Sequence, residues 1–164
     1  MTLARFKAQN HPQQVARRGP RPEIDERATD PELFARFDER FGFTLDVCAQ
    51  PRNARCARFY TPADDGLAQS WARERVWCNP PYSSIEPWVR KAWCEDAELI
   101  VMILPANRTE QDWWQRHVEP WRDRGRLRVE FLAGRVRFIA YGADGIGANE
   151  RPPFGSALLI WGPR

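Results

Sequence analysis

Six consecutive apolar residues at positions 99–104 (LIVMIL) constrain the fold of this 164-residue chain more than any other feature. A strand with one face in water alternates apolar and polar residues, so this run predicts a strand that is covered on both faces. Parallel sheets with helices packed on each side cover their strands in this way. The run therefore favours an α/β fold.

Three helices are expected from capping and periodicity. The first has Thr29 or Asp30 as its cap, Pro31 at its first position and Gly42 after its end. Tryptophans at helical spacing in the later helices, Trp88 among them, are expected to belong to the core. Capping boxes predict the start of the other two helices, with Ser83 and Glu86 forming one box and Thr109 and Asp112 the other.

Strand-like segments alternate with these helices. Besides the run at 99–104, strands are expected at 43–49, 76–78, 127–132, 136–140 and 157–161. Alternation of this kind, closing with a strand-rich C-terminal third, predicts an open α/β sheet with helices on both faces.

Positive charge is concentrated in residues 1–22, which hold five basic residues and no acidic residue. This segment has no apolar pattern and contains three prolines and a glycine. We therefore expect residues 1–28 to form a basic arm without a fixed fold, ahead of a single domain at 29–164. Two interpretations stay open: the arm, with Arg17 and Arg18, binds nucleic-acid phosphates, or it is a solvated tail.

Composition argues against several classes of protein. No apolar run approaches membrane-spanning length and the N-terminus lacks a secretory apolar core, which predicts a soluble, cytoplasmic protein without membrane partners. His11 and His117 are far apart in the sequence, so no metal site is expected. The four cysteines lie at uneven spacings without a C-x-x-C pair, and neither zinc nor a disulfide framework is suggested: Cys48, Cys56, Cys78 and Cys94.

The tetrapeptide NPPY at 79–82 follows the apolar strand at 76–78. The amine of adenine, cytosine or a carboxamide is a poor nucleophile because its lone pair is delocalised. The side-chain oxygen of Asn79 and the backbone carbonyl of Pro80 can each accept one amine hydrogen and aim the lone pair at a methyl donor. The prolines preset this geometry, and Tyr82 offers a ring on which an extruded base can stack. The alternative is a plain strand-ending turn.

The chain resembles the S-adenosylmethionine-dependent amino-methyltransferases, and most closely the phage-type DNA N6-adenine methyltransferases of the Dam family. The likeness runs from about Thr29 to Trp161. It implies a compact, Rossmann-like class I methyltransferase sheet that is mostly parallel, with an antiparallel C-terminal strand. The matching residues are Phe41-Gly42-Phe43, Leu45-Asp46, Asn53-Ala54, Cys56, Thr61, Asp64-Asp65, Leu67, Trp71 and the segment 77–83 (WCNPPYS).

The resemblance also implies where S-adenosyl-L-methionine binds. Asp46 and Ala49 are expected to line the cofactor at the end of the first strand. Asp65 should accept a hydrogen bond from the adenine amine of the cofactor, with Leu67 against that ring. Thr29 stands where the family contacts the methionine end, although the proline that follows it in the family is displaced by one position here. Without the resemblance, the acidic pair at 64–65 could be an ordinary turn.

For the reaction, the resemblance implies methyl transfer to N6 of an adenine flipped from duplex DNA, inside the host cytoplasm if a phage encodes the chain. Two other functions stay open: the same loop could act on RNA or on a protein glutamine, or the chain could be a non-catalytic nucleic-acid-binding relic. The catalytic residues implied are Asn79, Pro80, Pro81 and Tyr82.

DNA reading has little room for a separate recognition domain in a chain of this length. We therefore expect it to come from loops, from the arm or from a second copy in a homodimer. The best loop candidate is the glycine-rich segment 141–153, preceded by Arg135 and Arg137. Alternating arginines of this kind can contact phosphates or simply form the wet face of a strand.

Overall fold

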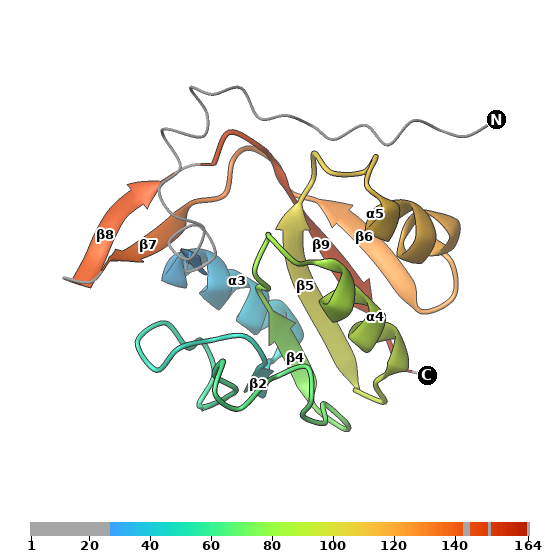
Figure 1. Ribbon diagram of the computed structural model, residues 1–164, viewed down its shortest axis with the longest axis horizontal. Helices are drawn as coiled ribbons and strands as arrows, with labels where there is room; N and C mark the ends of the chain where they lie inside the picture. The colour runs from blue at the N-terminus through green and yellow to red at the C-terminus, as the bar shows by residue number, and fades with distance from the viewer. Residues whose placement is uncertain (1–26, 143–144, 151, 164) are drawn as a thin grey trace.

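The computed structural model describes residues 27–142, 145–150 and 152–163. Six strands form the main sheet in the order β3-β2-β4-β5-β9-β6 (Figure 1). Strands β3, β2, β4 and β5 are parallel, whereas β9 is antiparallel to both of its neighbours. The predicted Rossmann-like sheet, mostly parallel with an antiparallel C-terminal strand, is confirmed. The strands are β2 (Leu45–Asp46), β3 (Arg58–Phe59), β4 (Arg75–Cys78), β5 (Leu99–Pro105), β6 (Leu127–Phe131) and β9 (Ser156–Trp161).

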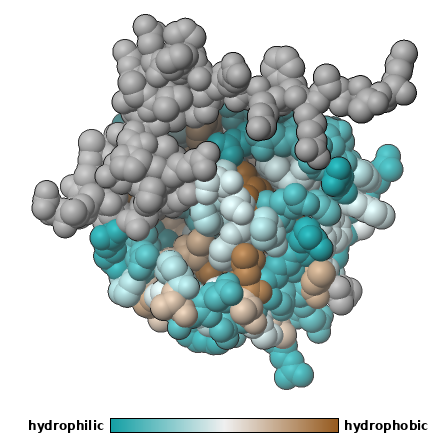
Figure 2. Space-filling model, viewed as in Figure 1, coloured by the Kyte–Doolittle hydropathy of each residue, from teal (hydrophilic) through white to brown (hydrophobic). Residues whose placement is uncertain are grey.

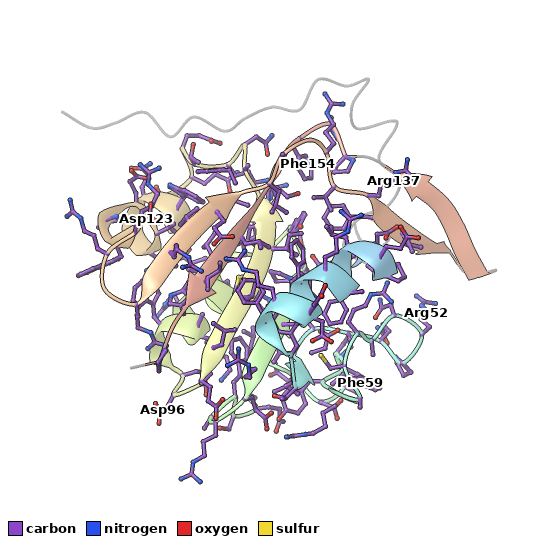
Figure 3. The ribbon with its side chains drawn as sticks, turned by 180° about the vertical axis from the view of Figure 1, so that it is seen from behind. Arg52, Phe59, Asp96, Asp123, Arg137 and Phe154 are labelled. Carbon is purple, nitrogen blue, oxygen red and sulfur yellow. The ribbon has the colours of Figure 1, made fainter. Side chains whose placement is uncertain are left out.

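Helices cover both faces of this sheet, as predicted. Alternate residues of β5 point to opposite sides, with Met102 in one buried cluster and Ile103 in the other. Helices α4 (Glu86–Cys94) and α5 (Asp112–His117) lie on the first side, and a short 3₁₀ helix (Glu119–Trp121) follows. Helix α3 (Pro31–Phe41) lies on the second side, as the two opposite views show (Figures 1 and 3). The outer surface over α4 and α5 is mostly hydrophilic (Figure 2).

Helix α3 begins and ends as its sequence predicts. The Asp30 carboxylate accepts hydrogen bonds from the backbone N–H groups of Glu32 (2.9 Å) and Leu33 (3.3 Å), and Pro31 follows it. Gly42 ends the helix in the left-handed conformation, with φ of 62°. A side-chain cap of this kind stabilises a helix by about 1 kcal/mol.

The capping boxes predicted for the other two helices are wrong. The residues that precede α4 and α5 are Ile85 and Gln111, and neither makes a side-chain cap hydrogen bond. In each case a turn closed by a backbone hydrogen bond takes up the residues expected to start the helix. The carbonyls of Pro81 (3.1 Å) and Arg108 (3.2 Å) accept these bonds.

A second, three-stranded sheet was not predicted. It has the order β1-β7-β8 and is antiparallel, with strands β1 (Arg27–Thr29), β7 (Phe138–Gly142) and β8 (Gly145–Glu150). The segment 141–153, expected to be a loop, therefore contains β8 and the end of β7. Its glycines hide the alternation that marks a strand, and pairing with β7 supplies the order instead.

Strand boundaries also differ from those expected. The first strand of the main sheet is two residues long rather than 43–49, and the strand predicted at 136–140 begins at Phe138. Strand β1 already begins at Arg27, two residues before the expected start of order. The rest of the proposed arm lies outside the described residues. Within the described ranges, no helix is both long enough and apolar enough to cross a membrane.

Candidate active site

A cavity of about 350 Å³ lies at the carboxyl ends of β2 and β4. Open α/β sheets bind ligands at this edge, and the volume is at the lower end of the range for small-molecule sites. Segments far apart in the sequence meet there, namely the end of β1, the loop after β2, the segment after β3 and the loop after β4. Among the residues proposed from the sequence, those that line the cavity are Thr29, Asp46, Ala49, Asp65, Asn79 and Pro81.

Asp46 ends β2 and is 3% exposed. One carboxylate oxygen accepts a hydrogen bond from the Cys48 N–H (3.2 Å), and the other accepts one from the Arg55 N–H (3.0 Å). Burial raises the pKa of Asp46 to about 6, because desolvation outweighs the opposing effect of these two hydrogen bonds and of the Arg55 charge. The carboxylate is therefore mostly ionised at neutral pH, and each oxygen keeps capacity to accept from a ligand.

Arg55 connects β1 to this cavity. Its guanidinium donates two hydrogen bonds, of 3.0 Å and 2.5 Å, to the backbone carbonyl of Thr29. Sequence reasoning missed Arg55, although it lies between Asn53-Ala54 and Cys56, which had matched the family pattern. A basic residue inside that pattern was the available signal.

Thr29 has an unusual hydroxyl. The residue is 1% exposed and lines the cavity, and its Oγ1 has no hydrogen-bond partner among the described residues. A buried polar group left unpaired costs about 1 to 3 kcal/mol. A polar ligand in the cavity would supply the missing partner.

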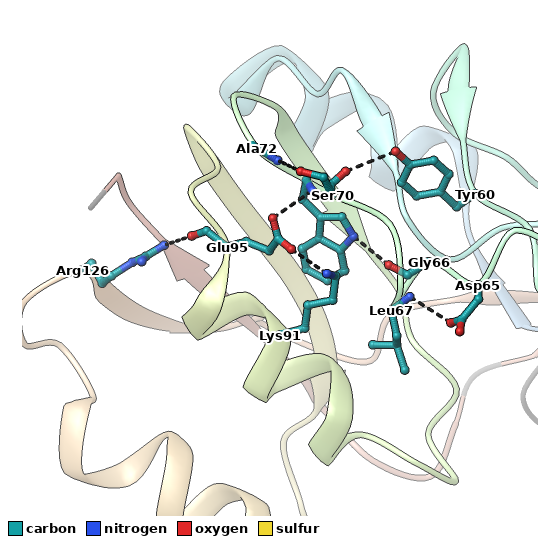
Figure 4. Close-up of polar contacts among 10 residues, drawn as sticks. Tyr60, Asp65, Gly66, Leu67, Ser70, Ala72, Lys91, Glu95 and Arg126 are labelled. Atoms are coloured by element: carbon teal, nitrogen blue, oxygen red, sulfur yellow. Dashed lines mark hydrogen bonds and ion pairs between the residues drawn. The ribbon is translucent and has the colours of Figure 1, made fainter.

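The two acids of the loop at 64–67 have different surroundings. Asp64 accepts hydrogen bonds from the N–H (2.8 Å) and hydroxyl (2.7 Å) of Thr61, which lower its pKa, and it does not line the cavity. Asp65 does line the cavity, and its carboxylate accepts from the Leu67 N–H (3.2 Å; Figure 4). Leu67 was expected beside the cofactor, but it packs against the core cluster of the α4 side and is not part of the cavity wall. The turn closed by Asp65 directs it there.

Gly66 and Trp71 fix the position of this loop. A Cβ added at Gly66 would lie 2.2 Å from the backbone oxygen of Val47, so the loop can approach β2 only with glycine at this position. The indole N–H of the fully buried Trp71 donates to the Gly66 carbonyl (2.9 Å; Figure 4). Trp71 stacks on Trp88, with ring centroids 6.3 Å apart, and Trp88 lines the cavity. Trp88 was predicted as core and serves as both core and cavity wall.

The NPPY loop follows β4 directly and borders the cavity. Asn79 and Pro81 line it, while Pro80 is buried beneath them. The guanidinium of Arg108 donates a hydrogen bond to the Tyr82 carbonyl and holds the end of the loop. Two of the four motif residues therefore face the cavity that contains Asp46 and Asp65.

Tyr82 is not among the residues that line the cavity, and it packs against both core clusters. Its ring lies 6.1 Å from the ring of Phe138, edge to face, and 6.2 Å from that of Phe154. Its hydroxyl donates a long hydrogen bond (3.4 Å) to the Ile103 carbonyl, and burial raises its pKa far above the usual range. The sequence predicted a role for the ring face alone, and the structure adds a partner for the hydroxyl.

Arg135 and Arg137 lie in the loop before β7 rather than on a strand. They border a second hollow of about 400 Å³, between this loop and the start of α3, to which Arg36 also contributes. We call this hollow the arginine groove. Arg17 and Arg18 lie outside the described residues.

The cysteines and metal-binding residue types form no further site in the described ranges. All four cysteines are free thiols, and burial raises the pKa of Cys56 to about 12. No group of three or more metal-binding side chains lies together in the part of the chain that the structure describes.

The sheet order, the cavity at its carboxyl edge and the NPPY loop beside it are those of a Rossmann-like methyltransferase. A family model described as DNA N-6-adenine-methyltransferase (Dam) matches residues 18–164, and the chain belongs to this family.

Three relatives match part of the chain. A DNA N-6-adenine-methyltransferase of Escherichia phage T1 is 36% identical over 84 residues, covering 49% of this chain and 35% of that protein. One of Haemophilus phage HP1 is 35% identical over 65 residues, or 38% of each protein. The putative methyltransferase YfdM of Escherichia coli K12 is 34% identical over 71 residues, covering 39% of this chain and 74% of the YfdM chain. The matched segments thus span little more than a third of the two phage proteins.

Proposed function

We propose that this protein transfers a methyl group from S-adenosyl-L-methionine to N6 of an adenine extruded from duplex DNA. One observation carries the proposal: Asn79, the candidate for orienting the amine, lines the same cavity as Asp46 and Asp65, the candidates for holding the cofactor. Family membership and the names of the two phage relatives support adenine in DNA as the substrate.

The residues of the cavity fit this cofactor. The unpaired Thr29 hydroxyl and the Asp46 and Asp65 carboxylates offer polar contacts to its amino, hydroxyl and adenine-amine groups. Trp77 and Trp88 supply apolar wall for flat or aliphatic parts. When bound, the cofactor supplies a methyl group on a positively charged sulfur.

The NPPY loop would orient the amine. The Asn79 side-chain oxygen and the Pro80 carbonyl would each accept one N6 hydrogen, which draws the nitrogen lone pair out of conjugation with the ring. Pro80 and Pro81 restrict the backbone dihedrals, and Arg108 holds the Tyr82 carbonyl. Acceptors restricted in this way would need little rearrangement when a base binds, which is the condition for electrostatic stabilisation of a transition state.

An extruded base loses its stacking neighbours in the duplex. The ring of Tyr82, with Phe154 beside it, would replace part of that stacking. Base–aromatic stacking is worth about 1 to 3 kcal/mol. We also assign DNA contacts to Arg135 and Arg137 and to Arg17 and Arg18 of the N-terminal segment.

Incubation with S-adenosylmethionine carrying a labelled methyl group tests this function. Duplex DNA, RNA and a ribosomal protein mixture are offered separately, and incorporation is counted in each. We expect label in duplex DNA alone, and none with Asn79→Ala. Label in RNA or protein but not in DNA would contradict the proposal, and no label in any substrate with correctly folded protein would favour a non-catalytic relic.

A further inference from the structure

The arginine groove holds three guanidinium groups with no protein partner in the described residues. Arg36, Arg135 and Arg137 are all exposed, and they line one hollow of about 400 Å³ between the start of α3 and the loop before β7. No described residue forms a hydrogen bond or an ion pair with any of the three. Three like charges around one concave surface repel one another unless an anion joins them.

Several other surface arginines of this protein are paired. Arg40 makes two hydrogen bonds of 2.7 Å to the Glu130 carboxylate. Arg116 pairs with Asp112 on α5, and Arg122 pairs with Glu119 of the 3₁₀ helix that precedes it. Acidic side chains are thus available to arginines across the surface. The groove also contains Asp30 and Glu32, but the Asp30 carboxylate is engaged in capping α3.

The protein holds the groove arginines in place through their neighbours. Val136 is 7% exposed and Phe138 is 2% exposed, so the residues on either side of Arg137 are anchored in the core while Arg137 itself is exposed. Leu33, Phe37 and Leu132 provide apolar surface beneath the charges. Guanidinium groups on an anchored loop lose less freedom on binding than those on a mobile tail.

The groove adjoins the catalytic loop. Phe138 follows Arg137 directly, pairs with Thr29 across the β1–β7 ladder, and contacts the ring of Tyr82. Figure 3 labels Arg137 beside β7 and Phe154 on the same edge of the molecule. A duplex with one base at Tyr82 would have its neighbouring phosphates on this side of the protein.

We propose that the arginine groove binds backbone phosphates of the duplex next to the extruded base, an inference that rests on the proposed function. Arg36, Arg135 and Arg137 contact phosphate oxygens, and the apolar floor packs against deoxyribose. These contacts fix the position of the duplex without reading its sequence. Glu32, at the rim of the groove, weakens them by repulsion.

The test is duplex binding measured by fluorescence anisotropy over a range of salt concentrations, at saturating S-adenosylmethionine. Each lost phosphate contact should reduce the slope of log affinity against log salt by about 0.9, so R36A/R135A/R137A should reduce it by up to about 2.7. Arg90→Ala is the matched control, because Arg90 is an exposed arginine on α4, on the opposite face of the sheet. Glu32→Gln should tighten binding at low salt.

Two further readouts make the outcome specific. The triple variant should keep the wild-type affinity for S-adenosylmethionine, and R36K/R135K/R137K should recover most of the salt slope. The groove assignment would be overturned if the triple variant kept the wild-type salt slope, or if its salt slope fell only as much as that of Arg90→Ala. Fluorescence anisotropy measures DNA binding alone, so its result does not depend on methyl transfer. A wild-type protein that binds DNA through the groove but methylates none would overturn the proposed function alone.

Discussion

The cavity beside the NPPY loop and the arginine groove adjoin where β1 pairs with β7, yet their charged groups differ in their partners. In the cavity, the Asp46 carboxylate already accepts two backbone N–H groups, and the Asp65 carboxylate accepts one. In the groove, Arg135 and Arg137 have no partner among the described residues. The carboxylates of the cavity are thus positioned before a ligand binds, whereas the groove presents positive charge without a partner in the described ranges.

Because of this difference, we expect the binding of each ligand to depend on a different solution condition. Preset hydrogen bonds in a partly buried cavity respond to protonation and to small shifts of the backbone. Exposed charges that bind phosphates respond to salt. Substitutions in the cavity should therefore change the rate of methyl transfer or the affinity for the cofactor at any salt concentration, whereas substitutions in the groove should change the salt dependence of DNA binding.

The largest effect is expected for Asn79→Ala. Loss of one preorganised acceptor for the amine hydrogens should lower kcat by on the order of 10²-fold or more, with unchanged cofactor affinity. Single-turnover methyl transfer measures the rate, and calorimetry measures cofactor binding. Asn107→Ala, in the exposed part of the loop after β5, is the control and should be silent. Turnover of Asn79→Ala near the wild-type rate would end the catalytic assignment.

The pH dependence of stability should identify Asp46 as a desolvated acid. Its pKa is about 6 in the folded protein against an ordinary 3.8, so the folded state binds more protons between these values. Its contribution to stability is fully present below pH 3.8 and is lost as pH rises through about 6.

Relative to Asp46→Asn, the free energy of unfolding of the wild type without ligand should therefore fall by up to about 3 kcal/mol over this range. Urea unfolding at several pH values measures it. If the free energies of unfolding of the two proteins changed with pH in parallel, burial would not control the pKa of this carboxyl group.

Asp65 and Asp64 offer a comparison within the cavity loop. Asp65→Ala should weaken binding of S-adenosylmethionine by about tenfold or more, because loss of a hydrogen bond to a charged group costs about 1.5 to 3 kcal/mol. Asp64→Ala should leave the affinity close to that of the wild type, because Asp64 faces Thr61 and not the cavity. Calorimetry distinguishes them. Impaired binding in Asp64→Ala with unchanged binding in Asp65→Ala would move the role by one residue.

Gly66→Ala tests whether the cavity depends on the close approach of its loop to β2. The added methyl group would lie 2.2 Å from the Val47 oxygen, and overpacking of this kind costs about 1 to 3 kcal/mol. Gly162→Ala is the control, because the nearest atom to its added Cβ is 3.9 Å away. Thermal unfolding and cofactor titration should both report a loss for Gly66→Ala only. Equal behaviour of the two variants would mean that the loop can move freely.

The smallest effect is expected for Tyr82→Phe. This change keeps the ring contacts with Phe138 and Phe154 and removes only the long hydrogen bond to the Ile103 carbonyl. A neutral hydrogen bond contributes about 0.5 to 1.5 kcal/mol, and less at this length. Methyl transfer by Tyr82→Phe should therefore fall by a few-fold at most. Tyr82→Ala, which removes the ring, should weaken DNA binding more than Tyr82→Phe does. Equal damage from the two changes would assign the function to the hydroxyl.

Much of the fold could be predicted because its signals are local. The run at 99–104 is apolar at every position and forms β5, and Asp30, Pro31 and Gly42 set the ends of α3 by contacts within a few residues. Strand β8 could not be predicted in this way. Its order comes from pairing with β7, and its own residues carry no strand pattern.

The same distinction between local and non-local signals holds for the residues of the candidate site. Asp46, Asp65 and Asn79 could be proposed because motifs contain them, and the sheet then brings all three to one cavity. The contacts of Arg55 with Thr29 and of Trp71 with Gly66 depend on the folded chain, so their roles were missed. Leu67 stays a prediction for the cofactor: it is half-buried against the core cluster of the α4 side and is not among the residues that line the cavity.

We propose that one cavity presents both a methyl donor and the N6 amine of adenine to the NPPY loop. Mass spectrometry of nucleosides from duplex DNA, after reaction with wild type and Asn79→Ala in deuterated-methyl S-adenosylmethionine, tests it most directly. We expect labelled N6-methyl-2′-deoxyadenosine with the wild type and a loss on the order of 10²-fold or more with Asn79→Ala. Label on cytosine instead of adenine, or equal yields from the two proteins, would contradict it.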